Sequence, residues 1–366
     1  MGSFSPVSLP TLQQAIDRIP RIRLATLPTP LHELKRFSSF LGGPQIYMKR
    51  DDLTGLGLGG NKSRMFEFLL AQVLASNADV IIAGAAVQSN YCRQLVAACN
   101  VLGLDVELVL RRVRGTEDSA VQGNLLLDLL AGASIHIIEG NQESQRAYMY
   151  ELSESLRARG REPFVVRMAN DQLLYPDVIS YTNAFIELME QCAAMDLEPT
   201  HLYVASYDTT QAGLELGKSA TGAAIRIVGV APADWLKGAN ALIARCANEA
   251  AEVLELTCRI EPEEIVNTEA YVGKGYGFPT REGREMLNAV ARYEGIFLDP
   301  VYTSKAMAAL SDHIRAGILP KESRVLFLHT GGAPALFAYS EELVTHEMRK
   351  RLHFVSPSTR KTKTGR

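Results

Sequence analysis

A lysine at position 62 follows two glycines and an asparagine, and it opens a segment with the apolar spacing of a helix, 65–73. The first turn of a helix disfavours a cation, because the helix dipole and the free N–H groups there attract negative charge. A partly desolvated lysine at this place should lose its proton more readily than a surface lysine. A neutral amine is the form that attacks a carbonyl to give a Schiff base. A plain alternative also fits the pattern: Gly59 and Gly60 form a turn, Asn61 caps the helix and Lys62 is solvated.

Two polar clusters each stand between an expected strand and the helix after it. The first is Gln88-Ser89-Asn90, and in open α/β sheets ligands bind beyond the carboxyl ends of strands. Its hydroxyl, its amides and the N–H groups of the helix start suit a carboxylate, although a simple Ser89 helix cap explains the pattern as well. The second cluster spans 206–213, where hydroxyls and N–H groups can hold a phosphate. Asp208 would repel that phosphate unless it points away, and a capped turn is an equal alternative.

A third cluster follows the last expected strand. The two glycines after Thr330 leave room for a flat ring near the backbone, and the threonine hydroxyl can hydrogen-bond a ring nitrogen. Tyr302 is either an acid–base group or a packing residue, and we interpret His329 as a satisfied core residue. The histidines lack HExxH spacing, so we expect no metal site. The absence of GxGxxG after the first strand and of GxSxG argues against a nicotinamide enzyme and an elbow-type hydrolase.

Composition sets the class of protein. A chain of 366 residues is long enough for two domains. It is 47% hydrophobic and 22% charged, which is the balance of a globular enzyme, and its net charge of -3 gives no reason to expect a nucleic-acid partner. No apolar run reaches the roughly 18 residues of a membrane span, and no secretory signal is evident. Five cysteines without CxxC spacing predict a reduced, cytoplasmic protein without disulfides.

The order of elements predicts the fold class. Apolar runs bounded by turn residues indicate buried parallel strands, and segments of helical spacing separate them. The expected strands are 45–50, 79–84, 106–110, 134–138, 164–168, 202–206, 226–230 and 325–329. This alternation predicts parallel sheets with helices on both faces, arranged as two α/β halves with a cleft between them. We expect 261–279 to be loop-rich and the basic tail 355–366 to be disordered.

In this order, the motifs resemble the pyridoxal-phosphate enzymes of the D-cysteine desulfhydrase and 1-aminocyclopropane-1-carboxylate deaminase family. The resemblance covers about 29–339, and its specific parts are 49–62, 88–90, 299–302 and 330–332. It implies the tryptophan-synthase-β-like fold (fold type II), an α/β fold with two three-layer open parallel-sheet domains. Residues 1–62 and 176–350 would form a large cofactor-binding domain and 63–175 a small one. It also implies a homodimer.

The resemblance assigns the cofactor contacts. Lys62 would bind pyridoxal 5'-phosphate covalently and then act as the base at the substrate Cα. Asn90 would hydrogen-bond the phenolic oxygen of the cofactor, and Thr330 would face its pyridine nitrogen. The residues that would bind the phosphate are Ser206, Thr209, Thr210 and Gly213.

The resemblance also assigns the substrate contacts. Gln88, Ser89 and Asn90 would hold the carboxylate of a small amino acid. Tyr276 and Tyr302 would line the substrate side of the cofactor ring and take part in catalysis.

Two departures from the family pattern bear on the reaction. The deaminase branch has a glutamate and a leucine where this chain has Thr303 and Thr330, which is the desulfhydrase pattern. A neutral hydroxyl at the pyridine nitrogen leaves a weaker electron sink, sufficient when a good leaving group departs from Cβ. We therefore expect α,β-elimination of a small β-substituted amino acid, D-cysteine first, to pyruvate, ammonia and sulfide.

The second departure is the loop 206–210, where the family usually has Gly-Ser-Gly-Gly-Thr. It leaves elimination from another substrate such as L-cysteate open, beside the cyclopropane deaminase. From a different class, the chain could be a catalytically weak protein that binds the cofactor or an amino acid, an alternative motivated by Asp208.

Overall fold

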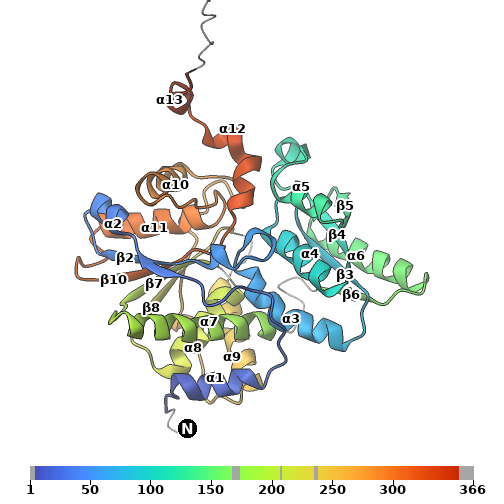
Figure 1. The fold of residues 1–366 in the computed structure, drawn as a ribbon, viewed down its shortest axis with the longest axis horizontal. Coiled ribbons are helices and arrows are strands. Elements are labelled where there is room, and N and C mark those ends of the chain that lie inside the picture. The colour runs from blue at the N-terminus through green and yellow to red at the C-terminus, as the bar shows by residue number, and fades with distance from the viewer. Residues whose placement is uncertain (1–4, 167–173, 207, 235–237, 354–366) are drawn as a thin grey trace, which may run out of the picture.

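Two α/β lobes, each built on its own sheet, make up the computed structural model (Figure 1). It describes residues 5–166, 174–206, 208–234 and 238–353, and the side chains of Thr116 and Glu117 are not described. The expected disordered tail, 355–366, lies outside these ranges. The fold class predicted from the alternation of strands and helices is confirmed, while the domain limits at 62 and 175 stay a prediction.

The larger lobe contains a six-stranded sheet with the order β1-β2-β10-β7-β8-β9. Its neighbouring strands are parallel except for β1, which pairs with β2 in the antiparallel direction. The strands are β1 (Leu31–Glu33), β2 (Gln45–Lys49), β7 (His201–Ala205), β8 (Arg226–Val230), β9 (Val266–Thr268) and β10 (Arg324–Leu328). The sequence pattern did not predict the two edge strands, β1 and β9, because three-residue strands show no periodicity.

Successive residues of the central strand β10 point to opposite faces and join two different cores. Phe327 belongs to the core on one face, and Leu326 and Leu328 belong to the core on the other. The first face is covered by α2 (Lys35–Leu41), α10 (Arg281–Glu294) and α11 (Thr303–Arg315). The second is covered by α7 (Tyr175–Ala194) and α8 (Thr209–Thr221), with α1 (Leu9–Asp17) and α9 (Ala239–Val253) packed outside them.

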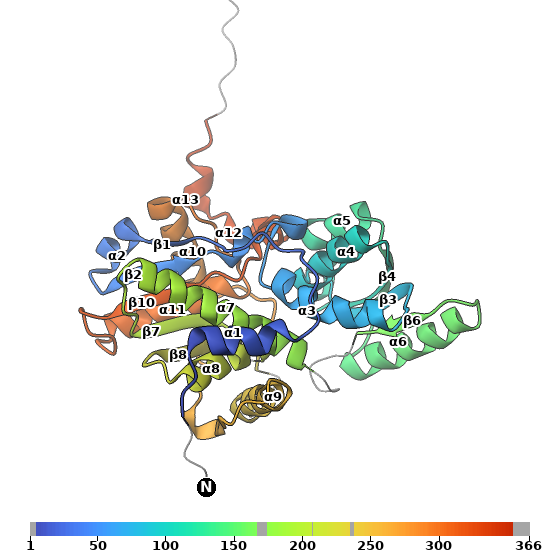
Figure 2. The ribbon, with the colours of Figure 1, turned by 60° about the horizontal axis from the view of Figure 1, so that its bottom comes forward.

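The smaller lobe contains a four-stranded parallel sheet with the order β5-β4-β3-β6 (Figure 2). Its strands are β3 (Val80–Ala86), β4 (Asp105–Arg111), β5 (Ser134–Ile138) and β6 (Pro163–Val165). Ile81 faces the core with α3 (Lys62–Ala75), α4 (Asn90–Leu102) and α5 (Gly123–Leu130). Ile82 faces the opposite core, with α6 (Gln142–Arg157). Helix α3 begins at Lys62, where the apolar spacing of the sequence predicted the start of a helix.

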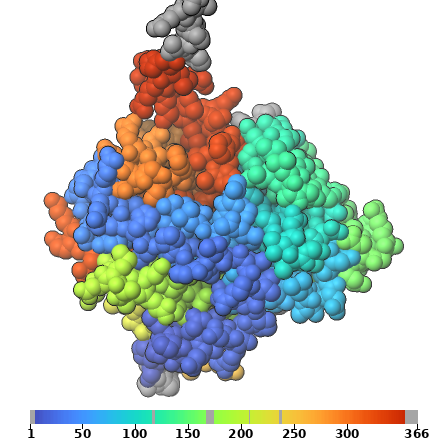
Figure 3. Space-filling view, viewed as in Figure 1, coloured from blue at the N-terminus to red at the C-terminus, as the bar shows by residue number. Residues whose placement is uncertain are grey.

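The N-terminal segments run over the surface of the larger lobe up to its border with the smaller one (Figure 3). Two short helices, α12 (Ser340–Leu343) and α13 (His346–Arg349), end the described chain. All five cysteines are free and buried. Within the described ranges, no helix combines the length and apolar character of a membrane span.

Candidate active site

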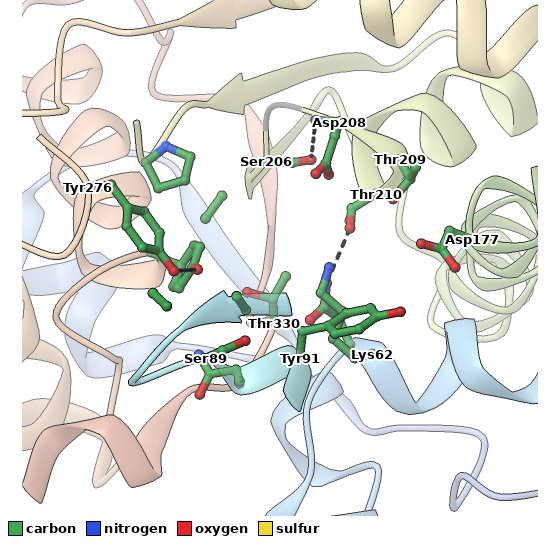
Figure 4. A pocket seen from close by; sticks show the side chains of 18 of the residues that line it. Lys62, Ser89, Tyr91, Asp177, Ser206, Asp208, Thr209, Thr210, Tyr276 and Thr330 are labelled. Atoms are coloured by element: carbon green, nitrogen blue, oxygen red, sulfur yellow. Dashed lines mark hydrogen bonds between the residues drawn. The ribbon is translucent and has the colours of Figure 1, made fainter. Parts of the chain in front are cut away.

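A cavity of about 260 Å³ lies between the two sheets, at the N-terminal ends of α3, α4 and α8. Strands β3, β7 and β10 end at this cavity, as expected for a ligand site in open α/β sheets. Nine of the residues predicted as a site line it: Lys62, Ser89, Asn90, Ser206, Thr209, Thr210, Tyr276, Tyr302 and Thr330. Most of them are visible in Figure 4. Residues spread over 269 positions of the chain thus meet in one place.

Lys62 is the first residue of α3 and is half-buried. The turn before it requires glycine, because Gly59 and Gly60 have φ of 71° and 134°. A Cβ on either would collide with the chain itself, on Asp52 and Gln94 respectively. Two residues further, Arg64 is buried and donates to both oxygens of Asp51 at 2.9 Å. These contacts fix the start of the helix and so the place of the Lys62 amine.

Asn61 ties the start of α3 to two other cavity segments. Its backbone N–H donates to Thr330 O at 2.9 Å, and its side-chain amide donates to Thr210 Oγ1 at 3.2 Å. Asn61 has helical φ and ψ and makes no side-chain cap bond, so the capping role considered from the sequence is wrong.

The N-terminus of α4 offers a polar edge to the cavity. Ser89 caps this helix and its hydroxyl accepts from Cys92 N at 3.2 Å. Asn90 is held by the buried Asn124, whose amide donates to Asn90 Oδ1 at 2.9 Å. Gln88 does not line the cavity. Its amide accepts from Asn124 N at 2.9 Å and donates to Gln122 O at 3.0 Å, so it organises the start of α5 instead.

The N-terminus of α8 forms another end of the cavity, where Ser206, Thr209 and Thr210 gather (Figure 4). Ser206 Oγ accepts from Gln211 N at 3.2 Å, while the first N–H groups of a helix have no intrahelical acceptor. Asp208 lines the same end and makes no cap bond with its side chain. Gly213 does not line the cavity. A Cβ there would come within 2.5 Å of Tyr181 Cβ, so this glycine lets α8 approach α7.

Asp177, from the first turn of α7, adds a second carboxyl group to the cavity wall. Burial raises its pKa to about 7, the positive charge of Lys62 acts in the opposite direction, and Asp208 raises it further. The sequence pattern missed this residue, because nothing near it distinguishes it from a surface acid in a first helical turn.

Tyr276 and Tyr302 share a hydrogen bond between their hydroxyl groups. Burial raises the pKa of Tyr276 to about 12, so its phenol is protonated at neutral pH. Asp299 accepts from the backbone N–H of Tyr302 at 2.9 Å and thereby holds this turn. Thr303 is buried, bonds to Asp299 at 2.7 Å and does not line the cavity. His329 is fully buried and contacts Phe297 O at 3.0 Å, consistent with the core role expected from the sequence.

Lys305 holds the loop before Tyr276 through hydrogen bonds to main-chain oxygens. Its buried ammonium group donates to Pro232 O at 3.2 Å, Val272 O at 2.8 Å and Gly275 O at 3.1 Å. Pro232 itself lines the cavity. Lys305 ends the candidate segment 299–305 of the sequence, but its role could not be predicted, since its partners are main-chain oxygens of distant segments.

The cavity fits pyridoxal phosphate in its donor groups. Hydroxyl and N–H groups at the start of α8 suit a phosphate, an amine on α3 suits an aldehyde, and Thr330 places a neutral hydroxyl on the wall. The carboxyl group of Asp208, at the phosphate end, opposes an anion. Among the described residues, no cluster of His, Cys, Asp or Glu is arranged to hold a metal ion.

Known proteins support this assignment over nearly the whole chain. The family model for "Pyridoxal-phosphate dependent enzyme" matches residues 22–331. A solved structure of an ACC deaminase homologue is 34% identical, with a TM-score of 0.81, and the match covers 91% of this chain and 98% of that one.

More distant structures share the fold alone. O-ureido-L-serine synthase is 16% identical with a TM-score of 0.61, covering 89% of this chain and 94% of that one. Diaminopropionate ammonia lyase from Escherichia coli, in its apo form, is 17% identical with a TM-score of 0.61, covering 94% of this chain and 93% of that one. The family model matches residues 22–331, and the ACC deaminase homologue is 34% identical over 91% of this chain. The chain therefore belongs to the family of pyridoxal-phosphate dependent enzymes and has their fold type II architecture.

Proposed function

We propose that the protein is a pyridoxal-phosphate dependent lyase that performs α,β-elimination on a small β-substituted amino acid. The substrate we propose first is D-cysteine, which with water gives pyruvate, ammonia and sulfide. The observation that carries the proposal is that Lys62, the tyrosine pair 276 and 302, and the α4 N-terminus line one cavity. Bound pyridoxal phosphate would supply a sink for the electron pair left on Cα.

Four groups of residues would hold the cofactor. In this proposal Lys62 binds its aldehyde carbon, the start of α8 with Ser206, Thr209 and Thr210 binds its phosphate, and Thr330 faces its ring nitrogen. Asn90 is the donor for its phenolic oxygen, and Asn124 fixes the side chain of Asn90 through a 2.9 Å bond. Gly213 and Gln88 support these groups through helix packing and loop contacts rather than by touching a ligand.

Other residues would act on the substrate. Ser89 and Asn90, with the free N–H groups at the start of α4, bind the α-carboxylate. Lys62 Nζ takes the proton from Cα, because a released lysine amine next to Cα is a base. Tyr276 holds its proton at neutral pH, since burial raises its pKa to about 12. The tyrosine pair is therefore a hydrogen-bond donor to the group that departs from Cβ.

One wall group favours elimination over cyclopropane opening. Thr330 borders the cavity and is neutral, so it does not keep the ring nitrogen protonated as a carboxylate would. The deaminase reaction remains the second candidate, supported by the 34% identity to an ACC deaminase homologue. Thr303 does not reach the cavity, so an effect of this position on the reaction would have to act through Asp299.

Release of oxo acids separates the candidates. The protein, loaded with cofactor, is incubated with D-cysteine, L-cysteine and the cyclopropane amino acid, and pyruvate and 2-oxobutyrate are measured separately. We expect pyruvate from cysteine, and none from a Lys62→Ala variant. If Lys62→Ala released pyruvate as fast as the wild type, Lys62 would not be the base at Cα. Release of 2-oxobutyrate alone would establish the deaminase instead, and no release from any substrate would favour a protein that only binds.

A further inference from the structure

Arg111 borders the route by which a substrate reaches the cavity. It is the last residue of β4, and it lines both the inner cavity and a second hollow of about 530 Å³. Gln142 and Tyr276 line both spaces as well. The second hollow is more open and is also lined by Arg112 and Lys274 against a single acid, Glu143. A ligand that passes between the two spaces therefore meets Arg111.

The side chain of Arg111 is held by a buried glutamine. Its Nε donates to Gln145 Oε1 at 3.2 Å. Gln145 is fully buried, and its own amide nitrogen donates to Ala85 O at 2.9 Å and Val109 O at 2.6 Å. These two bonds fix the amide so that its oxygen faces Arg111. The guanidinium is thus anchored at one edge, and its two terminal nitrogens make no hydrogen bond to a described residue.

The neighbouring arginines pair with carboxylates, whereas no carboxylate of the described residues pairs with Arg111. Arg112 pairs with Glu139 at 2.6 Å, and Arg114 pairs with Asp118 at 3.0 Å. Within the described ranges no carboxylate lies within ion-pair distance of Arg111. Burial lowers the pKa of Arg111, but an arginine stays charged at neutral pH. A half-buried cation that no described carboxylate neutralises is suited to an anionic ligand.

The other anionic groups of the proposed complex already have places. On the proposed function, the α-carboxylate lies at the start of α4 and the phosphate at the start of α8. The β-substituent is the group left for Arg111. Resting on that function, we propose that Arg111 binds the β-substituent of the substrate and selects amino acids in which this substituent carries negative charge, a thiolate or a sulfonate.

The elimination step is balanced for both groups. Lys62 takes the proton from Cα, the bond between Cβ and sulfur breaks, and its electron pair leaves with the sulfur. A thiolate takes a proton from the tyrosine pair as it leaves and departs as hydrosulfide, a sulfonate departs as sulfite, and neither needs an oxidant. A sulfonate gains a second negative charge in this step, so a guanidinium beside it stabilises the departing sulfite more than the bound substrate.

A series of substrates that differ in the charge of the β-substituent tests the role of Arg111. We measure kcat/KM for pyruvate release from both enantiomers of cysteine, of cysteate and of β-chloroalanine, whose substituent is neutral before it leaves. Loss of one charge-assisted contact corresponds to roughly tenfold or more. Arg111→Gln should lose at least that for cysteine and cysteate and less than about threefold for β-chloroalanine, and Arg111→Lys should recover part of the loss. Arg159→Gln, beyond the far end of α6, is the control that should change nothing.

Binding supplies a readout that does not depend on turnover. Calorimetry of cysteate with the cofactor-loaded protein should show at least tenfold weaker binding to Arg111→Gln. Equal binding to the wild type and the variant would overturn the inference, whether or not the protein turns over. An equal loss for β-chloroalanine would also overturn it and would place Arg111 at the α-carboxylate. Lack of turnover with every substrate, combined with Arg111-dependent cysteate binding, would refute the elimination and leave the anion site standing.

Discussion

The side chain of Asn61 donates a 3.2 Å hydrogen bond to Thr210 Oγ1, which joins the residue before the candidate lysine to the candidate phosphate loop. The two lie 149 positions apart in the sequence. One amide therefore sets the position of Lys62 relative to the start of α8. Replacing it changes the site without touching either sheet.

Asn61→Ala should weaken cofactor binding. The lost hydrogen bond corresponds to about 0.5–1.5 kcal/mol, or up to roughly tenfold in Kd. Titration of the cofactor-free protein with pyridoxal phosphate, followed by absorbance, measures this change. Asn100→Ala is the matched control, because it removes a 2.8 Å amide bond to Ala131 O at an exposed place. An unchanged Kd in Asn61→Ala would show that Thr210 is held by other contacts.

Asp208→Asn should tighten cofactor binding. The side chain lines the end of the cavity where Ser206, Thr209 and Thr210 gather, and removal of a like charge beside a phosphate gains about 1 kcal/mol at a partly exposed site. We expect Kd to fall about fivefold. Asp196→Asn, at the exposed end of α7, should leave Kd unchanged. If Asp208→Asn weakened binding, the carboxylate would be a ligand contact and not an obstacle.

Asp177 should make the cofactor-free protein less stable as the pH rises towards and through 7. Burial raises its pKa to about 7, so between the ordinary value for an aspartate, about 4, and 7 the folded state binds more protons than the unfolded state. The free energy of unfolding must then fall with increasing pH in this range. Urea unfolding at pH 5, 6, 7 and 8 gives the slope. The same series on Asp177→Asn should be flatter, and an identical slope would mean that Asp177 is ionised throughout.

Lys305→Met should destabilise the protein and disturb Tyr276. Three carbonyl oxygens, of Pro232, Val272 and Gly275, lose their ammonium donor. Leaving buried polar groups unpaired costs about 1–3 kcal/mol, and we expect a loss in that range by urea unfolding. Lys321→Met, at an exposed site, is the control. A stability equal to that of the wild type would show that the loop closes on itself without the lysine.

The sequence predicts the parts of this fold that depend on local periodicity. Helices such as α4 and α10 carry their own signals, a cap residue before the first turn and a left-handed glycine after the last, Gly103 and Gly295. The short strand β9 has no such signal, because it is defined by pairing with β8. The same holds for β1 on β2.

The site residues divide in a similar way. Residues at the ends of strands and the starts of helices, such as Ser89 and Thr209, were predicted from the sequence to lie together, because the fold class implies that these ends meet, and they line one cavity. Gln88 and Gly213 lie in the same motifs, but the structure uses them for the α5 loop and for packing against α7. The sequence did not predict Arg111 and Asp177 as residues of the cavity, because their place in it depends on which residues of the other lobe lie opposite them.

The placement of the lysines has a consequence for chemical labelling. Lys49 and Lys305 are 1% and 0% exposed, and both ammonium groups are held by fixed oxygens. Amine-directed reagents can therefore modify these two only after the chain opens, so their modification reports on unfolding. Lys62 is the lysine within reach of a reagent that enters the cavity formed by the described residues. If the native protein is treated with an amine-directed reagent shaped like the cofactor, peptide mapping should find the label on Lys62 and not on Lys49 or Lys305.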